Sequence, residues 1–128
     1  IFNDSPHFIN IFEKISQCIY NNFPQNIINP TFKKKYSIQI VDFWSNLYRE
    51  GDEAVYHTHK EADIAFCLYL QTDEKSSPII FDQIDLEIQP KNNMLIAFPG
   101  FLGHRVPKTI KSSEERISLA GNYIISNN

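Results

Sequence analysis

Residues 116–125 have the sequence RISLAGNYII, in which small or polar side chains alternate with apolar ones. Side chains two residues apart on a β-strand point to the same face of the sheet. Ile117 and Leu119 therefore share an apolar face, and the opposite face carries Arg116, Ser118, Ala120 and Asn122. The pattern suits a strand that packs on a core with one face and lines a cavity with the other, although a solvated second face would give the same alternation.

Five further segments are rich in β-branched and aromatic residues, as expected of β-strands. Turn-forming residues such as Gly51-Asp52 and Pro99-Gly100 separate them. The predicted strands are residues 36–49, 54–56, 64–71, 78–82, 94–98 and 116–125. Strands at such regular spacing predict a mainly β fold, a sandwich or barrel of the jelly-roll kind.

One segment near the start of the chain has helical character. Between residues 5 and 22, apolar residues recur at helical spacing, at Phe8, Ile9, Phe12, Ile15 and Ile19. We expect this helix to pack outside the jelly roll. At 128 residues the chain is expected to form a single domain, residues 1–128, with a helical segment and connector at 1–35 and the jelly-roll core at 36–128.

The composition disfavours several classes of partner. The net charge is −3, and the sequence has no basic tract that could neutralise a run of phosphates, so no nucleic acid is expected. It contains no long uncharged apolar stretch, so no membrane is expected. Cys18 and Cys67 lie among apolar residues without CxxC spacing, which favours core thiols in a reducing compartment. We therefore expect a soluble, cytoplasmic protein, and exposed aromatic side chains would suit a homodimer.

Two histidines, His57 and His59, are separated by one residue. In an extended chain their imidazoles point the same way, and imidazole is a ligand for Fe, Zn, Cu and Ni. His104 is the candidate third ligand, because it is the remaining histidine beyond the predicted helix and follows a Pro-Gly turn at 99–100. Spacing alone leaves open whether a metal is bound, since such pairs also arise by chance.

Several short motifs follow one another in a characteristic order. They are WSNLYREG at 44–51, His57-Thr58-His59, LYL at 68–70, FPGFLGHRV at 98–106, ERIS at 115–118 and Asn122. Together they resemble a bacterial and phage branch of the iron(II)/2-oxoglutarate-dependent oxygenases, over roughly residues 43–122. The resemblance implies a double-stranded β-helix, which is a jelly roll with helices packed outside.

The resemblance also implies roles for individual residues. His57 and His104 would hold Fe(II), and Arg116 would bind the far carboxylate of the co-substrate 2-oxoglutarate, with Ser118 beside it. A guanidinium offers a planar pair of donors to a carboxylate and keeps its charge when partly buried. Further positions expected to help hold the co-substrate are Asn46, Tyr69 and Asn122. The alternative for Arg116 is a surface ion pair with one of two acidic neighbours, Glu114 and Glu115.

The candidate metal site departs from the usual motif of the superfamily at one position. The usual motif is His-x-Asp or His-x-Glu, whereas His59 occupies the second place here. A neutral imidazole in place of a carboxylate leaves a bound iron one charge unit more positive. The branch that the chain resembles tends to carry His-x-His, so His59 is the expected third ligand. In the alternative registration, His59 and Glu61 form a His-x-Glu pair and His57 lies outside the ligand set.

The resemblance implies a dioxygenase that hydroxylates a small-molecule or peptidyl substrate while 2-oxoglutarate is decarboxylated to succinate. Two other classes of protein stay open on the sequence. A cupin-like three-histidine metalloprotein would bind a metal without using 2-oxoglutarate. A non-catalytic jelly-roll module would bind a partner and catalyse no reaction.

Overall fold

A computed structural model describes residues 6–22, 36–109 and 115–127. These residues form the helix α1 (Pro6–Asn22), a short 3-10 helix η2 (Asp82–Ile84) and eight strands. The strands are β1 (Tyr36–Tyr48), β2 (Ala54–His57), β3 (Ile64–Gln71), β4 (Ile79–Phe81), β5 (Leu86–Ile88), β6 (Leu95–Pro99), β7 (His104–Val106) and β8 (Arg116–Asn127). Six of the strands were predicted from the sequence. The sequence pattern missed β5 and β7, which are three residues long.

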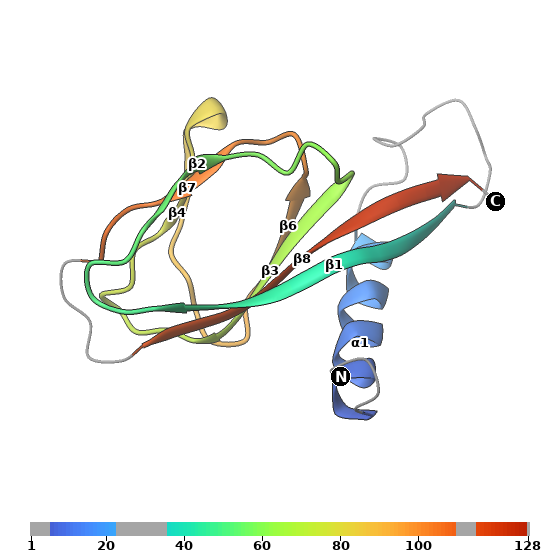
Figure 1. The fold of residues 1–128 in the computed structure, drawn as a ribbon, viewed down its shortest axis with the longest axis horizontal. Coiled ribbons are helices and arrows are strands. Elements are labelled where there is room, and N and C mark those ends of the chain that lie inside the picture. The colour runs from blue at the N-terminus through green and yellow to red at the C-terminus, as the bar shows by residue number, and fades with distance from the viewer. Residues whose placement is uncertain (1–5, 23–35, 110–114, 128) are drawn as a thin grey trace.

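The eight strands form two antiparallel sheets of four. One sheet has the order β1-β8-β3-β6 and the other has the order β2-β7-β4-β5. The chain crosses repeatedly from one sheet to the other, and the two sheets face each other in the ribbon (Figure 1). This arrangement confirms the predicted mainly β jelly roll, the double-stranded β-helix.

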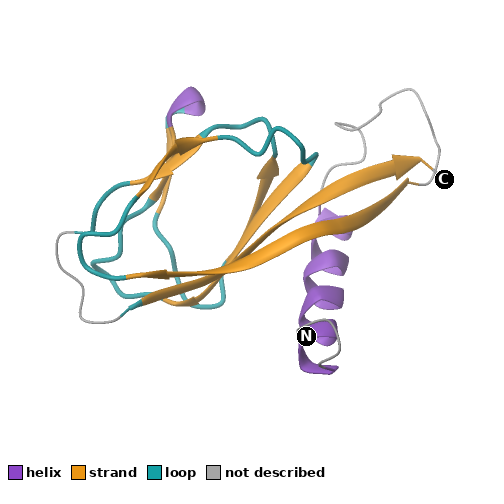
Figure 2. Ribbon diagram, viewed as in Figure 1, coloured by secondary structure: helices purple, strands orange, loops and turns teal. Residues whose placement is uncertain are grey.

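Helix α1 packs against the outer face of the β1-β8-β3-β6 sheet (Figure 2). Ile15 and Ile19 of the helix are buried against side chains of β3 and β8, namely Ile64, Phe66, Leu119 and Tyr123. A hydrogen bond of 2.7 Å joins the hydroxyls of Ser16 and Tyr123. The predicted helix outside the jelly roll is therefore confirmed, and its packing leaves the inner face of this sheet available for a site.

The strand register brings polar residues of three strands into one row on that inner face. Ser118 at the centre of the row is paired with Asn46 of β1 and with Tyr69 of β3. Two residues earlier on β8, Arg116 is opposite Tyr48. The polar face predicted for β8 thus faces the interior between the sheets.

Some expectations concern the chain outside this core. The division into residues 1–35 and 36–128 stays a prediction, because the connector at 23–35 lies outside the described residues. Neither Cys18 nor Cys67 forms a disulfide. Cys18 is exposed, so its predicted core position is wrong: the buried ridge of α1 runs through Ile15 and Ile19, and Cys18 flanks it.

Within the described residues, α1 is too short and too polar to cross a membrane.

Candidate functional site

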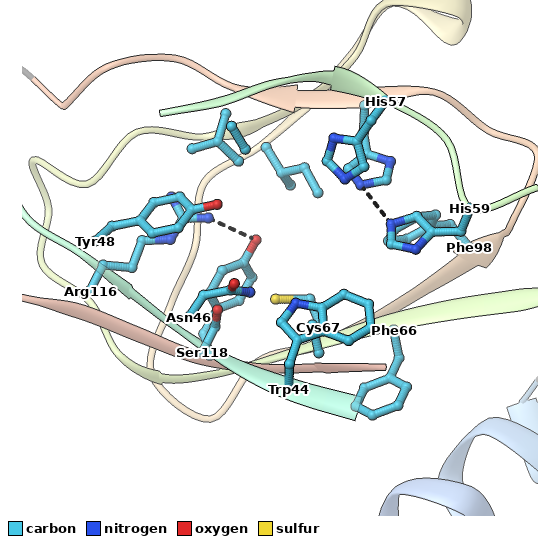
Figure 3. A pocket seen from close by; sticks show the side chains of 16 residues that line it. Trp44, Asn46, Tyr48, His57, His59, Phe66, Cys67, Phe98, Arg116 and Ser118 are labelled. Atoms are coloured by element: carbon cyan, nitrogen blue, oxygen red, sulfur yellow. Dashed lines mark hydrogen bonds between the residues drawn. The ribbon is translucent and has the colours of Figure 1, made fainter. Parts of the chain in front are cut away.

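Three imidazoles meet at one end of the space between the sheets. His57 is the last residue of β2 and His104 is the first residue of β7, and the two are paired across these strands. His59 follows in the loop after β2, and its Nε2 lies 3.3 Å from Nε2 of His104. Nitrogens of all three rings lie within 4.8 Å of one another (Figure 3). This cluster can hold one metal ion.

Two of the rings are oriented by backbone carbonyls. Nδ1 of His57 donates to the carbonyl of Val55 at 2.8 Å, and Nδ1 of His104 donates to the carbonyl of Leu102 at 3.1 Å. A carbonyl oxygen only accepts, so in the neutral rings the proton is on Nδ1 and the lone pair is on Nε2. Such hydrogen bonds are the usual means of fixing the tautomer of a metal-binding histidine.

Backbone contacts hold the loop that carries His59. Its amide donates to the carbonyl of Gly100 at 2.8 Å, and the amide of Gly100 donates to the carbonyl of Asp63 at 3.1 Å. Gly100 approaches so closely that a Cβ at this position would overlap the carbonyl oxygens of Ala62 and His59. The loop after β2 is therefore fastened to the turn after β6, and a glycine is required at the contact.

The histidine cluster is electrostatically suited to a cation. Burial lowers the pKa of His104 to about 4. The pKa of His59 is also lowered, first by burial and then by the nearby charge of His57, while contact with Asn122 opposes this effect. His59 and His104 are therefore neutral at pH 7 and offer lone pairs. A set of three imidazole nitrogens fits Fe(II) and also Zn, Cu and Ni.

At the other end of the same space, Arg116 is buried, with 5% of its surface exposed. Its Nη1 donates to the carbonyl of Ser77 at 2.6 Å and its Nη2 to the hydroxyl of Tyr69 at 3.4 Å. The guanidinium carbon lies 5.2 Å from the ring centre of Tyr48 and 5.0 Å from that of Tyr69. The Nε of Arg116 is buried and has no hydrogen-bond partner among the described residues.

No carboxylate of the described residues forms an ion pair with Arg116. Glu115 instead pairs with the exposed Arg49 at 3.1 Å. The other acidic neighbour, Glu114, lies outside the described residues. A buried cation without a counter-charge is costly, so this end of the space is suited to an anionic ligand.

A cavity of about 220 Å³ joins the two ends (Figure 3). Its polar wall includes Asn46, Tyr48, Tyr69 and Ser118, and its apolar wall includes Trp44, Ile79, Phe98, Val106 and Ala120. Burial raises the pKa of Tyr69, so the phenol stays protonated. Because its oxygen accepts from Arg116, its own proton can be donated to another group, and its side chain also contacts Cys67.

Burial likewise raises the pKa of the Cys67 thiol, which lies on the cavity wall. A protonated thiol is a poor metal ligand, because the thiolate is the coordinating species. Cys67 is therefore part of the wall and does not belong to the histidine cluster.

The structure brings most of the predicted site residues to this cavity. Those that line it are His57, His59, His104, Asn46, Tyr69, Arg116 and Ser118. Asn122 lies beside His59 instead of beside Arg116. Glu61 is exposed in the turn after His59 and is outside the histidine cluster, so the geometry does not support the His-x-Glu registration.

Sequence reasoning missed the main-chain groups of the site. The carbonyls of Val55, Leu102 and Ser77 orient two histidines and the arginine. Backbone acceptors leave no signature in side-chain type, so only the fold locates them. The stacking of Trp44 on His59, with ring centres 5.9 Å apart, likewise emerged from the structure.

Comparison with known proteins gave no match to a protein-family model and none to a curated sequence. Solved structures do match. A prolyl-4-hydroxylase from Pseudomonas putida has a TM-score of 0.54 and 21% identity, over 66% of this chain and 52% of that one. A 2OG-Fe(II) oxygenase family oxidoreductase from Burkholderia pseudomallei has a TM-score of 0.60 and 14% identity, over 93% and 58%.

Two further solved structures extend the comparison. The viral collagen prolyl hydroxylase of Paramecium bursaria Chlorella virus-1, solved as a 2OG complex, has a TM-score of 0.65 and 16% identity, over 94% of this chain and 73% of that one. A cupin superfamily protein from Desulfitobacterium hafniense has a TM-score of 0.50 and 13% identity, over 79% and 88%. The chain spans little more than half the length of the two bacterial oxygenases. At these identities the likenesses show the fold: a jelly roll of the kind found in 2OG-Fe(II) oxygenases and cupins.

Proposed function

We propose that the protein is an Fe(II)- and 2-oxoglutarate-dependent dioxygenase that hydroxylates a small-molecule or peptidyl substrate. One observation carries the proposal: a single cavity has three imidazoles at one end and a buried, uncompensated guanidinium at the other. A metal ligand set and an anion-binding group in one cavity suit an acid that is held at both ends. 2-Oxoglutarate has this character.

His57, His59 and His104 would hold the iron through Nε2, since the Nδ1 atoms of the first and last donate to carbonyls. Bound Fe(II) with 2-oxoglutarate supplies the activation of oxygen and the decarboxylation to succinate. The three ligands are neutral, so they leave the full metal charge to attract a dianionic acid. Their shared rigidity comes from the β2–β7 pairing and from the fastened loop.

Arg116 would bind the far carboxylate of 2-oxoglutarate. Its hydrogen bond to Ser77 and its packing on two tyrosine rings fix the plane of the guanidinium before the acid arrives. The Tyr69 hydroxyl would add a donor to the same carboxylate. Ser118, beside it in the strand register, offers a hydroxyl, and Asn46 offers an amide. Charge-assisted hydrogen bonds of this kind contribute about 1.5–3 kcal/mol each.

The apolar wall would keep water from the reacting atoms. Trp44, Phe98 and Val106 line the cavity, and the ring of Phe98 packs against His104 with ring centres 4.8 Å apart. Of the three histidines, His57 is exposed, whereas His104 is buried. A substrate would therefore approach the metal from the side of His57, where the site meets solvent.

The test is addition of 2-oxoglutarate to the Fe(II)-loaded protein without oxygen, which should produce a visible charge-transfer band. Arg116→Ala should weaken 2-oxoglutarate binding by at least about tenfold, which corresponds to 1.4 kcal/mol. Arg49→Ala, which removes an exposed guanidinium paired with Glu115, is the matched control and should leave the band and its affinity unchanged. A band with unchanged affinity in Arg116→Ala would exclude the assigned role of Arg116.

The all-histidine cluster favours one alternative, a cupin-like three-histidine metalloprotein that does not use 2-oxoglutarate. None of the acidic residues in the described part of the chain joins the three histidines. Metal uptake without a response to 2-oxoglutarate would support this alternative. Failure to bind any divalent metal would instead support a non-catalytic binding module.

A further inference from the structure

His59, the third histidine of the cluster, has among the described residues no orienting hydrogen bond to a backbone carbonyl of the kind that His57 and His104 have. His57 and His104 each donate from Nδ1 to a backbone carbonyl. In the described residues no backbone carbonyl accepts a hydrogen bond from the ring of His59. Its Nε2 is directed at Nε2 of His104, so Nδ1 is the nitrogen that needs an orienting partner.

Asn122 of β8 lies where that partner is needed. It is on the same face of the strand as Ser118 and Ala120, at the end nearer the histidines, and its side chain contacts His59. Its Oδ1 is buried and has no hydrogen bond of good geometry within the described chain. An unsatisfied buried acceptor costs about 1–3 kcal/mol, so this atom calls for a donor.

We infer that Asn122 is a positioning residue of the metal site, whose Oδ1 accepts the Nδ1–H of His59 when a metal occupies Nε2. A neutral imidazole that gives Nε2 to a metal carries its proton on Nδ1. The Oδ1 of Asn122 is a buried acceptor without a partner in the described chain and its side chain contacts His59, so it is the group that would take this proton. The inference rests on the metal-binding part of the proposed function and is independent of 2-oxoglutarate.

An orienting role for Asn122 would compensate for the replacement of the usual Asp or Glu ligand by His59. A carboxylate ligand has no N–H to direct, whereas an imidazole can rotate and can bind through either nitrogen. An amide acceptor fixes the ring without adding charge, so the site keeps its neutral ligand set. Loss of such an orienting group typically weakens metal affinity by about 10–100-fold.

The inference is tested by titrating the metal-free protein with Co(II), without 2-oxoglutarate, in wild type and three variants. Asn122→Ala should weaken Co(II) binding by about 10–100-fold. Asn122→Asp keeps an acceptor at the same place and should restore the affinity. Asn10→Ala removes an amide from the exposed face of α1, away from the cavity, and is the matched control, with unchanged affinity expected. Unchanged affinity in Asn122→Ala would overturn the inference.

A spectroscopic measurement separates positioning from a general loss of structure. In the Zn(II)-loaded protein, the Nδ1–H proton of His59 should be protected from solvent exchange in nitrogen-edited NMR spectra. In Asn122→Ala this proton alone should lose protection, while those of His57 and His104 keep theirs. Equal loss at all three would indicate a structural defect and would contradict the inference.

The outcomes also separate this inference from the proposed function. A wild-type protein that binds no Co(II) would refute the metal site and the role of Asn122 together. A wild-type protein that binds Co(II), with Asn122→Ala weakened, but gives no band with Fe(II) and 2-oxoglutarate would refute the dioxygenase and leave the role of Asn122 supported.

Discussion

His57 and His104 face each other across the β2–β7 pair, with ring centres 4.3 Å apart. This pairing requires both to act on one ion, so removing either imidazole should abolish tight metal binding. Glu61 lies on an exposed turn outside the cluster. Isothermal titration with Fe(II) should therefore show large losses for His57→Ala and His104→Ala and none for Glu61→Ala. The opposite ranking of His57 and Glu61 would establish the His-x-Glu registration.

Arg116→Lys should bind 2-oxoglutarate less well than wild type and better than Arg116→Ala. Lysine keeps the positive charge but lacks the planar set of donors that also reaches the Ser77 carbonyl. We expect a loss of about tenfold, measured by the charge-transfer titration. Equal affinity of the lysine variant and wild type would mean that charge alone, without the shape of the guanidinium, accounts for binding.

Acid should destabilise the metal-free fold through His104. Burial lowers its pKa from 6.5 to about 4, so between these values the unfolded chain holds a proton that the folded chain lacks. The folded state is therefore favoured less as pH falls through this window, by about 2 kcal/mol near pH 5. Denaturant unfolding with a chelator at about pH 7.5 and about pH 5 measures the change. His104→Asn should reduce the difference, and an undiminished difference would exclude His104 as its source.

Gly100→Ala should lower both stability and metal affinity. The added methyl would overlap backbone carbonyls of His59 and Ala62, which cannot move without shifting the loop. Overpacking of this kind costs about 1–3 kcal/mol. Gly103→Ala is the comparison, because its methyl would meet the outer end of the half-exposed Tyr56 ring, which can turn aside. A thermal shift no larger for Gly100→Ala than for Gly103→Ala would contradict the account of the loop.

Trp44, the single tryptophan of the chain, should report metal binding by fluorescence. Its ring stacks on His59 at 5.9 Å and 10°. A Co(II) ion on His59 would lie close enough to quench the indole through its unfilled d shell. Mg²⁺, which prefers oxygen ligands, should leave the emission unchanged. Equal quenching by both ions would point to a different binding place.

The fold was predictable to the extent that strand pattern reveals it. The alternation in residues 116–125 predicted an apolar face that packs on a core and a second face that lines a cavity, and the packing of Leu119 against α1 follows that prediction. The missed strands β5 and β7 contain three residues each, too few for a period of two to stand out. The partners of β7 are β2 and β4, which are distant in sequence, so pairing rather than local preference creates this strand. β5 instead forms a short hairpin with the preceding strand β4.

The site residues likewise divide into those that could be predicted from the sequence and those whose place depends on the fold. Side-chain type and spacing were enough to nominate the three histidines, because few residue types bind a metal, and the family resemblance nominated Arg116. Asn122 shows what spacing cannot supply. Strand parity placed it on the same face as Arg116, but its distance along β8 brings it to the histidine end. That outcome depends on how the two sheets are stacked, which a single strand does not encode.

His59 and His104 are separated by 45 positions in the sequence, and the segment between them contains β3, β4, β5 and β6. An ion shared by these two imidazoles would act as a removable cross-link that closes half of the jelly roll into one loop, as a disulfide does. Removal of the ion should then destabilise strands that lie far from the ligands. Backbone amides of β4 and β5, which carry no ligand, should exchange with deuterium faster in the metal-free protein.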